Sequence, residues 1–271
     1  MKYKKILITG LLLIFTVSLV QSFFQEESDL QYIITNVFYL SASTIAFIAG
    51  IYAVKEYGLN STRGKAILFI TLGLLSWMVG EYLWSAFELI FDIDPFPSSA
   101  DVSYILAYPL LFIGLLYEIR LGKISWSFKK YLMLGLATIA FSIITIYFGI
   151  YLAYDVEATL VENMVSIFYG VGDLILIVIS LLLLILSAEY KGGKMFSAWL
   201  YVFVAMILMW GADIGFAMYT EEYESSLMMA ILLDHLWTAS YLFFTYALFN
   251  MGFVVHQINA NILQKLKTNK T

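Results

Sequence analysis

The sequence contains no cysteine, which removes several kinds of chemistry at once. Without cysteine there is no disulfide bond, no thiolate metal ligand, no cysteine nucleophile and no palmitoyl anchor. Charge is also scarce, because only 13% of the 271 residues are charged whereas 62% are hydrophobic. In an ordinary soluble domain about 25% of the residues are charged. We therefore expect an integral membrane protein.

Eight apolar runs are long enough to cross the hydrocarbon core of a bilayer, which takes about 20 residues in a helix. Only short connections join them, so no soluble domain fits between the runs. The predicted fold class is all-α, a polytopic membrane bundle of eight helices that includes repeated helical hairpins. The predicted helices span residues 6–24, 32–54, 66–90, 100–118, 131–153, 163–187, 196–219 and 227–253.

The first apolar run has a second interpretation. It follows a basic start and ends in short residues, as a cleaved signal peptide does, and cleavage would leave seven helices. We expect residues 1–24 to be a first transmembrane helix or a signal peptide. Residues 25–255 then form a seven-helix membrane domain, and residues 256–271 form a short basic cytoplasmic tail.

Lysine and arginine are missing from every second connection. All fifteen lie at the two termini or near residues 55–65, 120–130 and 191–194, whereas the intervening connections carry only acidic residues. Cations near helix ends stay on the cytoplasmic side of a membrane. We therefore predict a multi-pass protein of the cell membrane with a cytoplasmic C-terminus. Its acidic outer surface excludes nucleic acid as a partner, because nucleic acids are themselves anionic.

Five carboxyl groups fall inside the predicted helices, at similar depths in the outer part of the bilayer. A carboxyl group near the bilayer centre costs roughly 2.5 to 3.5 kcal/mol, and no Lys or Arg lies in the helix cores to compensate. Such groups are protonated, hydrogen-bonded, exposed to a water-filled cavity or paired with a bound cation. The five are Glu81, Asp101, Asp173, Asp213 and Asp234.

Tryptophans accompany two of these acids. Trp77 lies four residues before Glu81 and Trp84 lies three residues after it, so all three share one helix face. Trp210 lies three residues before Asp213 in a similar "WGAD" segment. This pattern predicts a pocket lined by acidic and aromatic side chains.

The helices that follow these two segments carry matching residues at equal offsets. We predict that residues 66–118 and 196–253 are two copies of one helical hairpin, and that equivalent acids meet at a common site, as in membrane proteins built from repeats. The matched residues are Asp101, Tyr104 and Tyr108 in the first hairpin and Asp234, Trp237 and Tyr241 in the second.

Purely structural alternatives stay open for several of these residues. Asp101 follows Ser98 by three positions, as the acidic member of a capping box does. Four aromatic residues also fit a belt at the membrane interface: Trp84, Tyr104, Tyr219 and Tyr223. The deeper acids also fit buried hydrogen-bonding groups without a ligand.

All three prolines lie in one stretch, "PFPSSADVSYILAYPLL" at residues 95–111. This stretch, with "WMVGEYLW", "WGAD" and "DHLW", resembles the multi-helix membrane sensor regions that precede diguanylate cyclase or histidine kinase modules. The resemblance implies a sensory role. The sequence ends about 18 residues after the last predicted helix, so we expect no output domain in it. The matching positions are Pro97, Ser98, Ala100, Asp101, Tyr104, Tyr108, Pro109 and Gly114.

Several cofactors are argued against by residue counts, and the cofactor stays unknown. Retinal needs an intramembrane lysine for its Schiff base, and the helix cores contain none. The only histidines, His235 and His256, are about 30 Å apart on one helix, which excludes bis-histidine haem and a zinc site with three histidines. A hard cation such as calcium stays open. Its candidate ligands are Glu81, Asp213, Asp234 and His235.

We expect a sensor or receptor-like protein whose outer pocket binds a cation, a cationic small molecule or a proton. It would contact the lipid bilayer and signal through a cytoplasmic or membrane partner. The alternative is a cation- or proton-coupled transporter, and an integral membrane enzyme comes third. A transporter needs access from both sides, and we expect no intramembrane acid in the cytoplasmic half, which favours sensing.

Overall fold

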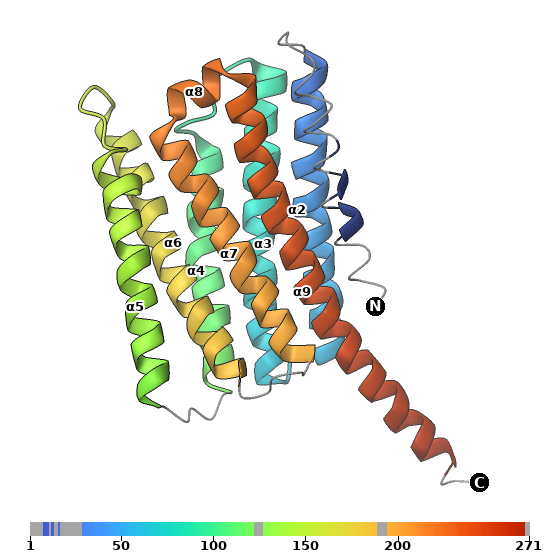
Figure 1. Cartoon of the computed structure of the whole chain (residues 1–271). Coiled ribbons are helices and arrows are strands. Elements are labelled where there is room, and N and C mark those ends of the chain that lie inside the picture. The colour runs from blue at the N-terminus through green and yellow to red at the C-terminus, as the bar shows by residue number, and fades with distance from the viewer. Residues whose placement is uncertain are drawn as a thin grey trace.

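A computed structural model describes residues 8–10, 12, 13, 16, 29–121, 127–188 and 194–268 of the chain (Figure 1). These residues form helices and connections, without a β-strand among them. Seven of the described helices are long and apolar enough to cross a membrane, as expected for a multi-pass protein. Most of residues 1–24, predicted as a first helix or a signal peptide, lies outside the described residues.

When the π-helical turns that continue α3 and α5 are counted with them, the helix bounds agree with the predicted bounds to within four residues, except at the C-terminal end. Two helices end in a π-helical turn, η1 (Phe87–Phe91) after α3 and η2 (Thr145–Tyr151) after α5, and the short helix α8 (Thr220–Ser225) precedes the last span. The long helices are α2 (Asp29–Tyr57), α3 (Thr62–Ala86), α4 (Ser99–Ile119), α5 (Phe128–Ile144), α6 (Leu160–Ser187), α7 (Lys194–Met218) and α9 (Leu227–Thr268).

Six of the long helices form a closed ring. Going round it, α2 contacts α3, then come α4, α6, α7 and α9, and α9 returns to α2. Helix α5 lies outside the ring, where it packs on α6, and its extension η2 also contacts α7 (Figure 1). A ring of this kind has an interior to which all six helices contribute.

Small and large side chains divide the ring into two layers along its axis. Toward the cation-rich end, alanines of α2 such as Ala46 and Ala49 let helices approach closely, and Ile67, Leu111 and Leu248 fill the centre. Toward the acidic end the centre is lined by acidic and aromatic side chains. The apolar layer is therefore the packed core, and the candidate site lies in the other layer.

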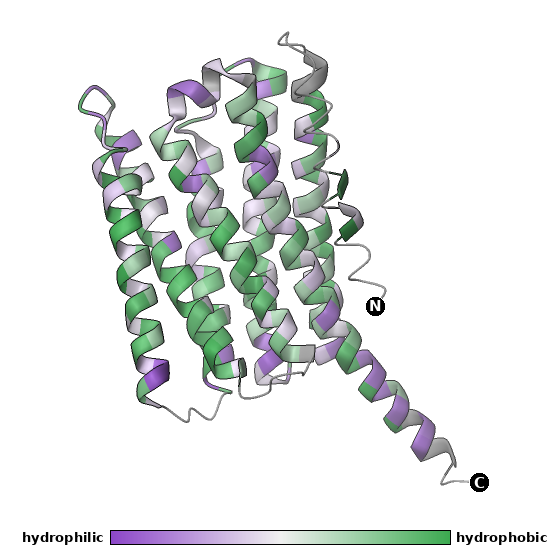
Figure 2. Ribbon diagram, in the orientation of Figure 1, coloured by the Kyte–Doolittle hydropathy of each residue, from purple (hydrophilic) through white to green (hydrophobic). Residues whose placement is uncertain are grey.

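The outside of the bundle is apolar, and hydrophilic residues gather at its two ends (Figure 2). Helix α9 continues beyond the other helices and projects from the bundle as a hydrophilic segment (Figures 1 and 2). Most of the predicted tail, residues 256–268, is thus a continuation of the helix that lines the candidate site.

Candidate functional site

A cavity of about 80 Å³ lies inside the ring, in the half nearer the acidic connections. It has room for several water molecules or for a small ligand. Lysine, arginine and histidine are absent from its described lining. The lining includes ten of the residues predicted from the sequence: Trp77, Glu81, Trp84, Asp101, Tyr104, Tyr108, Asp213, Asp234, Trp237 and Tyr241.

The five predicted carboxyl groups differ in accessibility. Asp101, Asp173 and Asp234 are buried, at 3%, 4% and 7% exposure, whereas Glu81 and Asp213 are partly accessible. Asp173 does not line the cavity and lies behind Tyr108. The two accessible carboxyl groups come from α3 and α7, on opposite sides of the ring, and they are the groups that a small ligand can meet.

Glu81 accepts two tyrosine hydrogen bonds. The hydroxyl of Tyr104 donates to Oε2 at 2.9 Å, and the hydroxyl of Tyr241 donates to Oε1 at 2.5 Å. Tyr104 belongs to the same predicted hairpin as Glu81, and Tyr241 belongs to the other. Glu81 is thus held between α4 and α9 across the cavity.

Asp213 is held in the corresponding way. Trp237 of its own hairpin donates from Nε1 to Oδ1 at 2.6 Å, and the hydroxyl of Tyr108 from the other hairpin lies 3.4 Å from Oδ2. Positions that matched in the sequence therefore make matching contacts. In each predicted hairpin, the donor three residues after Asp101 or Asp234 bonds Glu81 or Asp213 of the same hairpin. The donor seven residues after Asp101 or Asp234 reaches Asp213 or Glu81 of the other hairpin.

Two glycines admit the tyrosine rings that make these contacts. A Cβ atom on Gly80 would lie 2.5 Å from the ring of Tyr104, and a Cβ atom on Gly172 would lie 2.5 Å from the ring of Tyr108. Each glycine directly precedes the acid that its tyrosine bonds. The sequence contains this signal in the pairs "GE" and "GD", but the site was predicted without it.

Asp101 combines a structural role with a place in the cavity wall. Its Oδ2 accepts from the backbone of Ser98 at 2.7 Å, and the Ser98 hydroxyl accepts from Ala100, so the predicted capping box is confirmed. Its Oδ1 accepts from the hydroxyl of Tyr169 on α6. Tyr169 also lines the cavity and was not predicted.

Asp234 accepts a hydrogen bond from Tyr223 of α8 at 3.0 Å. Burial, together with the nearby carboxyl groups of Asp234 and Glu88, holds the pKa of the Tyr223 hydroxyl well above its usual value, so the hydroxyl stays a donor. Tyr223, Tyr104 and Trp84 line the cavity. Of the four residues that fit an interface belt, these three therefore face the cavity, whereas Tyr219 is 40% exposed and is not among the lining residues.

Two predicted residues lie away from the cavity. Trp210 donates to Thr145 of η2 at 2.9 Å and packs on Phe141 of α5. His235 contacts the carbonyl of Ile231 through Nδ1, and its Nε2 has no partner. Within the described ranges, no three Asp, Glu or His side chains are grouped to hold a metal ion. The calcium alternative therefore has no support in this part of the chain.

A second, open cavity of about 750 Å³ adjoins the first at the acidic end. We name it the vestibule. Glu88, Asp92 and Asp94 lie in its wall. Four aromatic residues line both cavities and therefore separate them: Trp84, Phe96, Phe216 and Tyr223.

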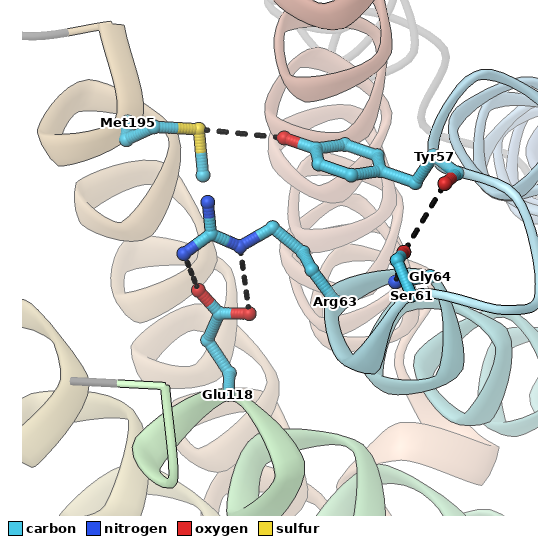
Figure 3. Close-up of polar contacts among 6 residues, drawn as sticks. All are labelled: Tyr57, Ser61, Arg63, Gly64, Glu118 and Met195. Atoms are coloured by element: carbon cyan, nitrogen blue, oxygen red, sulfur yellow. Dashed lines mark hydrogen bonds and ion pairs between the residues drawn. The ribbon is translucent and has the colours of Figure 1, made fainter.

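The cation-rich end of the ring carries an ion pair that the sequence analysis missed (Figure 3). Arg63 at the start of α3 bonds Glu118 at the end of α4 through two nitrogens, at 2.7 and 3.1 Å. Nearby, Tyr57 of α2 contacts the sulfur of Met195 of α7 at 3.6 Å. Glu118 is 5% exposed and lies within the candidate membrane span Ser99–Ile119, at the end predicted to be cytoplasmic, so the expectation that this half holds no intramembrane acid is wrong. It failed because Glu118 sits in the last turn of its helix, where it was not counted with the helix acids.

Comparison with protein-family models, with curated proteins and with solved structures gave no match for this chain.

Proposed function

We propose that the protein is a membrane receptor-like sensor that binds a small organic cation in the cavity of the ring. The observation that carries this proposal is the convergence of four carboxyl groups from α3, α4, α7 and α9 on a single cavity whose described lining contains no basic residue. A cation is the ligand that compensates such a site. A cation paired with these groups offsets the cost of placing them within a membrane.

Aromatic walls support an organic cation over a hydrated metal ion. Trp77, Trp84 and Trp237 line the cavity, and tryptophan has the ring face that attracts ammonium groups best. The small volume favours a compact ammonium ion. The negative charges of Glu81 and Asp213 then face the cation from two sides of the ring.

Helix α9 supports a signalling role, because it links the cavity to the far end of the molecule. It carries Asp234, Trp237 and Tyr241 in the cavity wall and continues unbroken to Thr268, beyond the bundle (Figure 1). A ligand that shifts this helix at the cavity would also move its projecting end. We propose that a cytoplasmic or membrane partner reads this movement.

Thermal unfolding in detergent tests the binding site. We expect ammonium, methylammonium, tetramethylammonium or tert-butylammonium to raise the unfolding temperature increasingly with concentration. At 100 times the dissociation constant, the stabilisation is about 2.7 kcal/mol. The neutral analogues methanol and tert-butanol serve as matched controls for solvent effects, and they should give no such rise.

Substitutions at the two accessible carboxyl groups complete this test. Asp213→Asn and Glu81→Gln should fold and lose the response to cations, because each removes a charge that faces the cavity. Glu222→Gln, at an exposed site on α8, should keep the response. The proposal is wrong if no cation of the panel shifts the wild type, or if the neutral analogues stabilise it equally.

A transporter is the second candidate, and the arrangement of the ring favours it. Helices α2, α3 and α4 form one half of the ring, α6, α7 and α9 form the other, and α5 lies between them in sequence. The matching contacts of Glu81 and Asp213 are consistent with two repeated halves around a central site, as in transporters built from parallel repeats. Glu118 also removes one argument against access from the cytoplasmic side.

Flux through reconstituted vesicles separates the two candidates. A sensor should bind radiolabelled methylammonium without accumulating it in proteoliposomes, whereas a transporter should accumulate it in response to a cation or proton gradient. Asp213→Asn vesicles serve as the control for passive leak. Uptake above this control would favour transport over sensing. The proposed binding site would be the same in both cases.

A further inference from the structure

Asp173 and Asp213 share the hydroxyl of Tyr108 as a hydrogen-bond donor. Asp173 lies on α6 and Asp213 on α7, and this hydroxyl lies 2.9 Å from Oδ1 of Asp173 and 3.4 Å from Oδ2 of Asp213. A tyrosine hydroxyl has one proton to donate, so it cannot satisfy two ionised carboxylates at once. Two ionised carboxylates around this hydroxyl are therefore short of donors, and a proton on one of them removes the shortage.

The hydrogen bonds around the pair indicate which group carries the proton. Asp213 already accepts from Trp237 and faces the hydroxyl of Tyr108, which suits an ionised carboxylate. Asp173 accepts from Tyr108 at 2.9 Å through Oδ1, whereas its buried Oδ2 meets no donor. The proton therefore belongs on Oδ2 of Asp173, which turns this unpartnered acceptor into a donor.

Among the described residues, the neighbouring elements bring no cation to the pair. Besides the two acids, the titratable groups whose charges act here are Tyr108, Tyr169, Glu81 and Tyr241, from α4, α6, α3 and α9. Asp101 of α4 is linked to them through Tyr169. The side chain that η2 places against α7 is Thr145, which does not titrate. These tyrosines and carboxyl groups are neutral or negative, and none of them can be positive. The negative charge of the pair is therefore neutralised by a proton or by a bound ligand.

We propose that Asp173 and Asp213 form a proton-binding site in the wall of the cavity, and that this proton leaves when a cation binds beside Asp213. The exchange conserves charge, because one positive charge enters the cavity as the proton passes from Oδ2 of Asp173 to water. The release step rests on the proposed binding of cations, whereas the proton itself does not. Asp173 is a positioning residue here, because it acts on the ligand through Asp213.

Infrared spectroscopy of the ligand-free protein tests the proton. At neutral pH the wild type should show the C=O stretching band of a protonated carboxyl group, and Asp173→Asn should lose a band of one carboxyl. Asparagine suits this test because its amide can still donate a hydrogen bond but holds no carboxyl proton. Glu222→Gln, which removes an exposed carboxylate, should leave the band unchanged. Equal bands in wild type and Asp173→Asn would overturn the proposal.

Proton release on binding tests the exchange. In weakly buffered detergent solution with a pH-indicator dye, tetramethylammonium should release up to one proton per wild-type molecule and none from Asp173→Asn. The wild-type dissociation constant should weaken by up to tenfold for each unit of lower pH, and that of Asp173→Asn should change much less. Binding without release would overturn the exchange. If no cation binds, the proposed function fails, and the infrared band still decides whether the pair holds a proton.

Discussion

At the scale of single residues, the site depends on glycines as much as on acids. Gly172 lets the ring of Tyr108 approach α6, where its hydroxyl reaches Asp173 and lies near Asp213. Gly80 does the same for Tyr104 and Glu81. Each acid is therefore bonded by a tyrosine that only a residue without a side chain admits at that distance.

Alanine at position 172 tests this dependence. The new methyl group would lie 2.5 Å from the Tyr108 ring, so either the ring or α6 has to move. We expect a loss of about 1–3 kcal/mol in the free energy of unfolding, as for other overpacked interiors, seen as a lower unfolding temperature in detergent. Gly211→Ala is the matched control, because no atom lies within 4 Å of its Cβ position. Equal stability of the two variants would show that the ring is not held by Gly172.

At the scale of helices, the ion pair of Arg63 and Glu118 fastens the start of α3 to the end of α4. The Arg63 side chain is 34% exposed and that of Glu118 is 4% exposed, so the pair lies between the exposed and the buried class. Glu118→Gln should cost about 1–3 kcal/mol, above the value for exposed pairs and below that for buried ones. Thermal unfolding at low and high salt measures this loss.

The pair of Glu56 and His256 provides a control for this helix contact. The His256 side chain is 57% exposed, so Glu56→Gln should change the free energy of unfolding by less than about 1 kcal/mol. If Glu118→Gln is no less stable than Glu56→Gln, the ion pair of Arg63 and Glu118 does not fasten the two helices.

Helix positions were predictable because the bilayer fixes their length, and the convergence of the acids was predictable because an intramembrane acid needs compensation. Other features depend on local geometry that this reasoning omits. Trp77 precedes its acid by four residues and Trp210 by three, and one residue turns a side chain by about 100°. This difference directs Trp210 toward α5 and away from the cavity.

The C-terminal extension shows a second limit of the same reasoning. The prediction ended the last helix at residue 253, where the apolar run stops, but α9 continues to Thr268. Residues such as Gln264 and Lys265 favour a helix without being apolar. Hydropathy therefore located the membrane span of α9 and not its end. The π-helical turns η1 and η2 were also not predicted, because such turns have no signature in composition.

At the scale of the whole molecule, the two ends of the ring differ in kind. The acidic end holds the vestibule and the cavity, whereas the other end is packed and carries the ion pair of Arg63 and Glu118. A ligand that reaches the cavity by way of the vestibule passes the four aromatic residues that line both. Orientation in the membrane therefore decides from which side the proposed ligand would come.

Cysteine labelling in intact cells tests the orientation, and a chain without cysteine suits it because each variant has a single thiol. Ser225→Cys lies at the acidic end and Asn60→Cys at the cation-rich end, and both positions are exposed. Because Lys and Arg are retained on the cytoplasmic side, an impermeant maleimide added outside should label Ser225→Cys at once. It should label Asn60→Cys only after the membrane is permeabilised. The reverse pattern would place the vestibule in the cytoplasm, and the proposed sensor would then respond to an internal cation.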